Sequence, residues 1–325
     1  RGTDNSQNPY INNLIKSLLN SYNIINLRRS SNSGIIQIFF YFFRSEIIVF
    51  NWIENLPDRK AGKIQIYFLH MLFFLKNITG KKVIWIMHNK ISHSKTNILQ
   101  KKKLFLFLLK KSDYIFTHSS EGKRYVKEQF PLAFHKTFYT PHPVSKSEFL
   151  KTDQKTRKID FIIWGTMAEY KSVDKFLNYL QQNNLKDIYT IQIIGKFPSE
   201  KYLEKVLRLA GKKTEVINRF ATKDELHKAI LNSKFVLFTY NDDSVLSSGA
   251  LIDTLVFDTD IIGPRKGAFK DLGEMGIIHT FEKYDDIIDI FNSGPSENLE
   301  KKRSEFLKKN SWSKFADYFS ETISG

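Results

Sequence analysis

The sequence predicts an α/β protein with two Rossmann-like domains, each built on a parallel sheet. Short apolar segments of strand type alternate with helical patterns through both halves of the chain, and this alternation is typical of parallel sheets. A polar, charged stretch at 146–159 lacks periodicity and is typical of a linker between the halves. The 325 residues, of which 42% are hydrophobic, are enough to fill two cores.

In the first half, each element follows from its own pattern. Pro9 stands before apolar residues at helical spacing and predicts that a helix starts there. The predicted helices span 10–19, 33–43, 63–76, 98–111 and 121–130. We expect the second of these to be buried, because it is almost entirely apolar. Strands are predicted over 24–27, 46–50, 82–87 and 114–117.

In the second half, the same alternation continues. Strands are predicted over 160–164, 190–194, 215–217, 235–239 and 260–263. Helices are predicted from Val173 and over 199–210, 223–232 and 248–257, and the tail at 298–320 has the pattern of one long amphipathic helix. We therefore expect domains at 1–145 and 160–297, a linker at 146–159, and a C-terminal helical segment at 298–325 that packs back toward the first domain.

The charge is unevenly distributed along the chain. The formal net charge is +16; residues 1–150 carry 23 basic and 8 acidic side chains, whereas residues 151–325 carry 27 and 26. A net charge of +15 in the first half predicts an anionic partner there: nucleic acid, a membrane surface or an acidic substrate. The absence of Cys excludes disulfides, Cys-ligated metals and thiol catalysis. No apolar run reaches the roughly 20 residues of a membrane-spanning helix.

One loop of the second half has the composition of a phosphate site. Gly165 ends a predicted strand and is followed by Thr166 and, before the next helix, by Lys171. A Gly lets the backbone approach a ligand, and a Lys beside a helix start adds positive charge for a phosphate. The alternative is an ordinary loop between a strand and a helix, with a surface Lys.

A second loop is rich in small residues. Ser247, Ser248 and Gly249 precede a predicted helix that carries Asp253. Small residues leave room for a diphosphate, and the Asp253 carboxylate is able to accept hydrogen bonds from ribose hydroxyls. The alternative is equally simple: a Ser caps the helix and the Asp complements its dipole.

Two strand ends of the first half carry polar and aromatic residues: Asn51, Trp52 and Glu54 after one strand, and His88, Asn89 and His93 after the next. A His at a strand end is able to exchange hydrogen bonds with a substrate near neutral pH, and a Trp offers a flat face to a sugar ring. A structural His and a half-buried Trp are the alternatives. No carboxylate lies beside the two His residues, which disfavours a metal site. The G-x-S-x-G, G-x-G-x-x-G and P-loop motifs are absent.

Taken in order, these segments resemble the retaining nucleotide-sugar glycosyltransferases of the large family 4 over nearly the whole chain. Gly165 and Lys171 match the family's G…K loop, and Gly195 ends the next strand. The segment 248–255 (SGALIDTL) resembles SGxLLEAL, and 112–119 (SDYIFTHS) resembles a strand of the first domain. The family has the GT-B architecture, in which two Rossmann-like domains with parallel sheets face each other across a cleft, and the resemblance implies that fold here.

The resemblance also implies a role for each candidate residue. His88 and Lys171 would act on the donor sugar and on its diphosphate. The donor-binding residues implied are Gly165, Thr166, Lys171, Gly195, Ser247, Ser248, Gly249 and Asp253. The acceptor-binding residues implied are Asn51, Trp52, Glu54, Asn89 and His93. Two positions depart from the family: Thr166 stands where Arg is common, and Val245 stands at the first of two acidic positions, the second being Asp253.

The expected protein is therefore a retaining hexosyltransferase. It would move a sugar from a UDP or GDP donor, without a metal or other cofactor, to a hydroxyl of a bacterial surface or capsular polysaccharide precursor. The basic first domain predicts contact with an anionic membrane surface, through the helix at 101–111, and a location in the cytoplasm at the inner face of the plasma membrane. Alternatives are a non-catalytic nucleotide-sugar-binding scaffold and a nucleotide-sugar epimerase. A nucleic-acid partner is not expected, because the basic residues do not interleave with a stacking motif.

Overall fold

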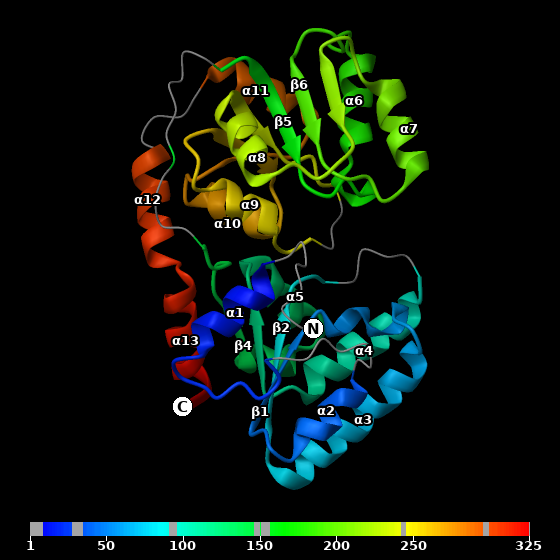
Figure 1. Ribbon diagram of the computed structural model, residues 1–325, viewed down its shortest axis with the longest axis vertical. Helices are drawn as coiled ribbons and strands as arrows, with labels where there is room; N and C mark the ends of the chain where they lie inside the picture. Colours follow the sequence, from blue (N-terminus) through cyan, green and yellow to red (C-terminus); the bar gives the residue numbers. More distant parts are fainter. Residues whose placement is uncertain are drawn as a thin grey trace. The chain divides into compact units, whose positions relative to one another are not determined.

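The chain divides into two compact units (Figure 1). The computed structural model describes residues 9–27, 35–90, 96–145, 150, 157–241, 245–294 and 299–324. Unit 1 comprises Arg1–Ser145 and Asn310–Gly325, and unit 2 comprises Lys146–Lys309. The described residues of each unit form one sheet, and strands alternate with helices along the chain in both.

Unit 1 is built on a four-stranded parallel sheet. The strands follow one another in chain order: β1 (Ile47–Asn51), β2 (Lys82–Met87), β3 (Tyr114–Thr117) and β4 (Thr137–Tyr139). Every pairing between neighbours is parallel. The carboxyl ends of the four strands therefore lie at one edge of the sheet, where ligands bind in folds of this kind.

Helices cover both faces of this sheet. Successive strand side chains point to opposite faces, so Ile84 and Ile86 pack against α1 (Tyr10–Leu18) and α13 (Trp312–Ser324). On the other face, Trp85 packs edge-on against Phe105 at 5.0 Å between ring centroids. The remaining elements are α2 (Ile36–Phe42), η1 (Ile53–Asp58), α3 (Gly62–Thr79), α4 (Ile98–Lys111), α5 (Ser120–Gln129) and η2 (Pro131–Lys136).

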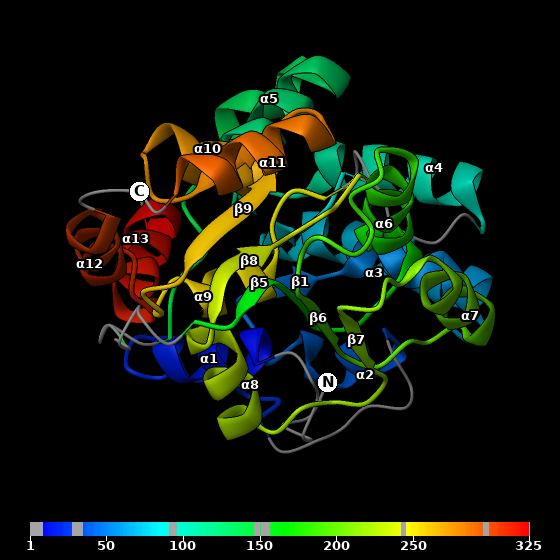
Figure 2. The same ribbon diagram turned by 90° about the horizontal axis from the view of Figure 1, so that it is seen from above.

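Unit 2 is built on a six-stranded parallel sheet with the order β10-β9-β8-β5-β6-β7. Figure 2 shows most of these strands side by side. Their bounds are β5 (Ile159–Trp164), β6 (Ile191–Ile194), β7 (Thr214–Ile217), β8 (Ser233–Leu237), β9 (Asp260–Pro264) and β10 (His279–Phe281). The chain order reverses direction at β5, between β8 and β6, and such a point is where ligands bind in open parallel sheets.

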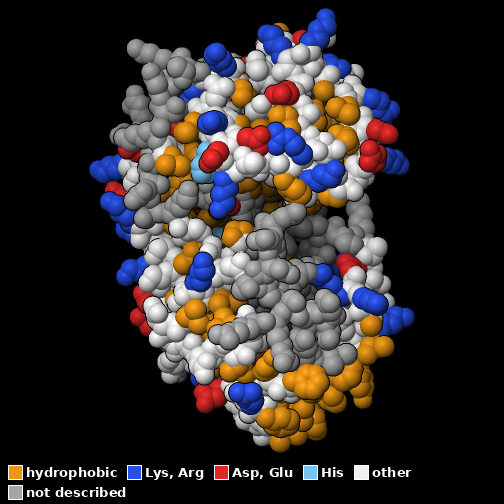
Figure 3. All heavy atoms as spheres, in the orientation of Figure 1, with side chains coloured by type: hydrophobic (Ala, Val, Ile, Leu, Met, Phe, Trp, Pro, Cys, Tyr) orange, Lys and Arg blue, Asp and Glu red, His pale blue; other side chains and the backbone are white. Residues whose placement is uncertain are grey.

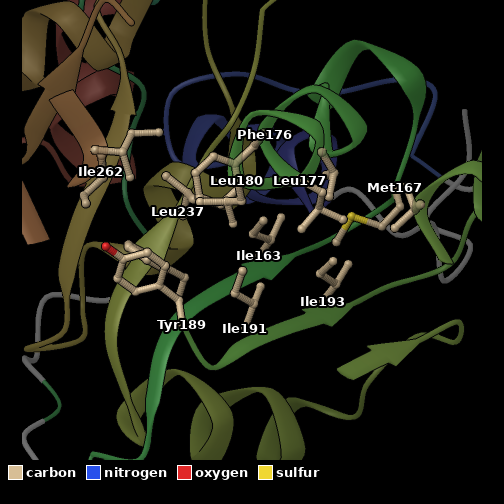
Figure 4. Packing of buried hydrophobic residues seen from close by; sticks show 14 of the residues in the cluster. Ile163, Met167, Phe176, Leu177, Leu180, Tyr189, Ile191, Ile193, Leu237 and Ile262 are labelled. Atoms are coloured by element: carbon tan, nitrogen blue, oxygen red, sulfur yellow. The ribbon is translucent and has the colours of Figure 1, made fainter. Parts of the chain in front are cut away.

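The helices of unit 2 bury the sheet. They are η4 (Glu169–Lys171), α6 (Val173–Gln182), α7 (Glu200–Leu209), α8 (Lys223–Leu231), α9 (Gly249–Thr254), α10 (Gly267–Glu274), α11 (Tyr284–Ser293) and α12 (Leu299–Lys309). Figure 4 shows Phe176, Leu177 and Leu180 of α6 packed over the strand residues Ile163, Ile191 and Ile193. Arg303 of α12 is fully buried and donates to the carbonyl oxygens of Phe257, Thr259 and Ile277, which joins α12 to this unit.

The predicted fold class is confirmed, with corrections to single elements. The segment 24–27 is a turn, because the described part of the sheet offers it no hydrogen-bonded neighbour. The helix predicted over 298–320 is two helices: Asn310 and Ser311 interrupt it, and the Asn310 carbonyl accepts from the Val144 amide at 2.8 Å instead. The buried helix predicted over 33–43 is α2, and its Phe40 is exposed.

Candidate functional site

In unit 2, the loop after β5 packs tightly on the loop after β6. The Gly165 amide donates to the Ile194 carbonyl at 3.0 Å, and the Met167 amide donates to the Lys196 carbonyl at 2.9 Å. A Cβ atom on Gly195 would lie 1.8 Å from the Gly165 carbonyl oxygen, which no side chain tolerates. Gly165 itself has φ +102°. The close approach of these two strand ends therefore depends on Gly at 195.

Lys171 folds back against this loop. Its Nζ donates to the Trp164 carbonyl at 2.8 Å and lies 5.5 Å from the centroid of the Tyr240 ring. A Cβ atom on Gly165 would come within 2.8 Å of the same Nζ. The side chain is 3% exposed, and no carboxylate among the described residues pairs with it. Burial lowers the pKa of Lys171 to about 7. An anion at this point would find an ammonium group without a competing acid.

The loop before α9 contributes hydroxyl groups. The Ser248 Oγ caps α9 by accepting from the Leu251 amide at 3.4 Å, and it lies 3.2 Å from the Tyr240 hydroxyl. The Ser247 Oγ is buried and has no hydrogen-bond partner among the described residues. A buried hydroxyl without a partner costs free energy, which a ligand atom would recover. Tyr240 thus connects Lys171 to this serine pair.

The other predicted donor residues lie on the loop after β5 and on α9. Thr166 is half-buried on the β5 loop, and Gly249 is exposed, with nothing within 4 Å of an added Cβ. Asp253 is exposed on α9. Val245 is buried and apolar, so the first acidic position of the family pattern carries no charge here. Unit 2 brings Gly165, Lys171 and Gly195 together, and Tyr240 links them to Ser248.

In unit 1, His88 is held on several sides at the end of β2. Its ring stacks on Trp52 at 4.1 Å and 12°, and Tyr10 packs edge-on against it at 4.7 Å. Its Nε2 donates to the Asn51 Oδ1 at 2.9 Å, so Nδ1 carries the lone pair. Asn51 ends β1 and Trp52 has φ +50°, which turns the chain sharply there. Burial lowers the pKa of His88 well below its usual value, and the ring is neutral at pH 7.

Two further histidines lie beside this group. The His118 Nδ1 donates to the Thr140 carbonyl at 3.0 Å, so its Nε2 accepts from the Tyr10 hydroxyl at 2.7 Å. His142 lies 5.1 Å from His118 between ring centroids. Burial lowers the pKa of His118 to about 3 and that of His142 to about 4. The strand ends of unit 1 therefore form a cluster of neutral rings.

The other predicted acceptor residues are placed differently. Asn89 is buried at the end of β2, and His93 lies outside the described residues. Glu54 is 1% exposed on η1, and neither of its carboxyl oxygens has a hydrogen-bond partner in the part of the chain that the structure describes. Burial raises the pKa of Glu54 to about 7. The structure brings Asn51, Trp52 and His88 into contact, but it does not present the Glu54 carboxyl to solvent.

Sequence reasoning missed several members of both groups. His118 and His142 follow strands, which is a usable signal, but β4 has only three residues and its pattern is weak. Tyr240 likewise follows β8. Trp312 joins the Tyr10 ring at 5.0 Å from the start of α13, far along the chain, and no local pattern predicts that contact.

The basic helix predicted to meet lipid is buried along one face. Lys101 of α4 is buried and forms an ion pair with Asp58. Leu104, Phe105 and Leu108 of the same helix are buried as well. Ile98, Leu99 and Leu106 of the helix are exposed, at 46%, 65% and 46%, so contact between this helix and lipid stays a prediction.

Two features are absent from the described residues. No group of three or more His, Asp or Glu residues in this part of the chain is placed to hold a metal ion. Of the described helices, none is both long enough and apolar enough to cross a bilayer.

Two parallel sheets of four and six strands, with polar residues at the carboxyl ends of their strands, define the class of fold: the protein has the GT-B fold. No protein-family model matches the chain, and no curated protein matches its sequence. Solved structures do match. HepE of Anabaena in complex with UDP superposes with a TM-score of 0.65 and 10% identity, over 89% of this chain and 81% of that one.

Other glycosyltransferase structures are similar too. A glycosyltransferase from Rickettsia africae has a TM-score of 0.61 at 11% identity, over 91% of this chain and 83% of that one. A UDP-forming trehalose-phosphate synthase from Burkholderia vietnamiensis has a TM-score of 0.59 at 11% identity, over 97% and 83%. Because the sequence identity is so low, these similarities establish the fold of the chain and nothing further.

Proposed function

We propose that this protein is a glycosyltransferase that moves a hexose from a nucleotide-diphosphate donor to a hydroxyl of a bacterial polysaccharide precursor. The observation that carries the proposal is Lys171, a buried lysine that pairs with no carboxylate among the described residues and packs against Gly165 at the end of β5. HepE, which shares the fold, was crystallised with UDP and with UDP-glucose. That likeness supports UDP as the first donor nucleotide to test, with GDP as the second.

Unit 2 would bind the donor. Negative charge grows on the leaving diphosphate as the bond to the sugar breaks, and a positioned ammonium group stabilises that charge. Lys171 would leave the Trp164 carbonyl for a phosphate oxygen, and the hydroxyl groups of Ser247 and Ser248 would donate to the same group. Asp253 would accept from the ribose hydroxyls. Because Thr166 supplies no charge where the family commonly has Arg, Lys171 has the larger part of this task.

Unit 1 would contact the reacting sugar and the acceptor. Asn51 uses the Nε2–H of His88, so the Nδ1 lone pair is the atom that would accept a sugar hydroxyl. The ring is neutral, as an acceptor must be. Trp52 keeps the imidazole plane in place by stacking on it, and Asn89 and His93 would line the acceptor side. The resemblance to family 4 supports retention by a front-face route, without a carboxylate base and without a metal.

The acceptor we propose is a glycan carried on a lipid diphosphate. The first half of the chain carries a net charge of +15, which suits an anionic, membrane-bound acceptor better than a neutral soluble one. The enzyme would then work in the cytoplasm at the inner face of the plasma membrane.

Thermal shift with nucleotides tests donor binding directly. A ligand at about 100 times its Kd adds about 2.7 kcal/mol to the unfolding free energy, so UDP or GDP should raise the Tm by several degrees. ADP serves as the control nucleotide. No shift with UDP or GDP would contradict the proposal.

Transfer then separates the remaining alternatives. The protein is incubated with radiolabelled UDP-hexoses and a bacterial lipid extract, and label should appear in the lipid fraction. Binding without transfer or donor hydrolysis would instead favour a non-catalytic scaffold, which the Val245 and Thr166 replacements make worth testing. Conversion of one UDP-sugar into its epimer would favour an epimerase.

A further inference from the structure

Helix α3 is apolar on both of its faces. Leu69, Leu72 and Phe73 are buried in unit 1. On the opposite side, Ile64, Tyr67, Phe74 and Ile78 are 56%, 69%, 64% and 67% exposed. Together with the half-buried Met71 they follow one another at helical spacing, so they form one stripe about 21 Å long at 1.5 Å per residue. A helix at the surface of a soluble domain normally carries polar residues there.

The neighbouring helix α2 extends this stripe. Phe40 and Phe43 are 78% and 73% exposed, while Phe42 between them is fully buried. The two helices are packed together, with the rings of Phe39 and Phe68 at 5.5 Å. Figure 3 shows hydrophobic side chains gathered over α2 and α3, in the lower part of the view. The α2–α3 apolar face is defined as Phe40, Phe43, Ile64, Tyr67, Phe74 and Ile78. A contiguous exposed patch of this kind usually marks an interaction surface.

The charged residues within the two helices of the α2–α3 apolar face are all basic. Neither helix contains Asp or Glu. Arg44 follows α2, and Lys60 and Lys63 flank the start of α3; all three are exposed. Long basic side chains next to an apolar surface keep their charges in water while their stems lie along it. The face therefore combines aromatic and aliphatic side chains with a cationic border.

We propose that the α2–α3 apolar face docks the protein on an anionic lipid bilayer. Aromatic and aliphatic side chains enter the acyl boundary of a bilayer, and flanking Lys and Arg meet anionic headgroups at about 1 kcal/mol each. A second copy of the chain fits less well, because a symmetric contact would bring the same cations against each other. This inference rests on the proposed function, in which the acceptor is held at a membrane surface.

The surface differs from the one that the sequence predicted. The helix at 101–111 has more Lys residues, but Leu104, Phe105, Leu108 and Leu109 are buried in the core and Leu106 is its one largely exposed apolar residue. In α3 the apolar side chains point outward. Membrane docking is therefore assigned to α2 and α3.

Vesicle cosedimentation of the full chain tests this surface. Vesicles of phosphatidylcholine with phosphatidylglycerol are compared with pure phosphatidylcholine at low salt. The triple variant Phe43→Ser, Tyr67→Ser and Phe74→Ser should lose at least ~10-fold in binding to anionic vesicles, since each ring no longer leaves water. The matched control is Leu132→Ser, Ile188→Ser and Leu207→Ser, which changes three apolar residues that are 74%, 56% and 50% exposed elsewhere. It should bind like the unchanged protein.

Three outcomes would overturn the proposal. The first is that the unchanged protein does not bind anionic vesicles. The second is that it binds pure phosphatidylcholine equally well, and the third is that the triple variant binds anionic vesicles as strongly as the unchanged protein. Light scattering adds a fourth: a dimer in solution that the triple variant abolishes would assign the face to a second copy. The UDP thermal shift of the triple variant should be normal. Loss of vesicle binding with a normal shift separates this inference from donor binding, and the absence of any UDP shift in all variants would affect only the proposed function.

Discussion

The two units place opposite chemistry at the carboxyl ends of their strands. The first half of the chain carries nearly all of the excess positive charge, yet the cluster at the strand ends of unit 1 consists of neutral rings: Tyr10, Trp52, His88, His118 and His142. The second half is close to neutral, yet unit 2 buries Lys171 beside its glycine loops. Net charge therefore describes the outer surface of each unit, and burial decides the chemistry at its strand ends.

The largest expected effect comes from removing the cation of unit 2. Lys171→Met keeps the buried stem but loses the ammonium group, so transfer from the donor should fall at least ~100-fold, the scale of one lost preorganised contact. The UDP thermal shift should shrink as well. Lys175→Met, an exposed Lys on α6, is the matched control. Turnover near normal in Lys171→Met would remove this residue from the donor site.

The next largest effect is expected at His88, in the cluster of neutral rings of unit 1. His88→Ala removes the lone pair proposed to accept a hydrogen bond from a sugar hydroxyl, so transfer should again fall ~100-fold. The rise in Tm caused by UDP should be unchanged. His135→Ala, an exposed His on η2, is the control. If His88→Ala lost UDP binding as strongly as Lys171→Met does, the proposed division of labour between the units would be wrong.

Gly195→Ala sharpens the role of the glycine loops. The added Cβ would lie 1.8 Å from the Gly165 carbonyl, so the two strand ends must separate. We expect a loss of about 1–3 kcal/mol in the free energy of unfolding, measured by urea denaturation, together with weaker UDP binding. Gly249→Ala has nothing within 4 Å of its new Cβ and should be near neutral. Equal stability of the two variants would contradict the close contact.

Acid should weaken unit 1 through its histidines. The pKa of His118 is about 3 in the folded protein and 6.5 in the unfolded chain. The unfolded state therefore binds more protons between these values. Stability is complete above pH 6.5 and is lost as the pH falls toward 3, at up to ~1.4 kcal/mol per pH unit. His118→Gln should flatten this slope in a series of Tm measurements, and an unchanged slope would contradict the burial of a neutral imidazole.

The smallest effect concerns protons taken up by unit 2. Burial lowers the pKa of Lys171 to about 7, from 10.5 in the unfolded chain, and a bound diphosphate would raise it again. At pH 8, UDP binding should therefore take up close to one proton, and calorimetry in buffers of different ionisation enthalpy measures it. Lys171→Met should show no such uptake. Proton release by the unchanged protein would contradict the proposed contact between Lys171 and phosphate.

Prediction from sequence worked best where the signal is local. The bounds of β2, β3 and α4 match their predictions, because strand and helix patterns depend on residues that are neighbours in the chain. It failed at Asn310, where a long helix is interrupted by a backbone contact with Val144. On α4, spacing alone does not show which apolar residues are buried: Leu104 and Phe105 are buried, whereas Leu106 is exposed.

The sequence by itself determined the alternation of strands and helices, the uneven charge and the polar loops that follow the strands, because these depend on residues close together in the chain. Only the tertiary structure decided that Lys171 is buried against Gly165, that Trp52 stacks on His88, and that the apolar stripe of α3 faces outward. Each of these depends on which distant segments exclude water from a side chain, and burial of that kind sets both its charge and its partners.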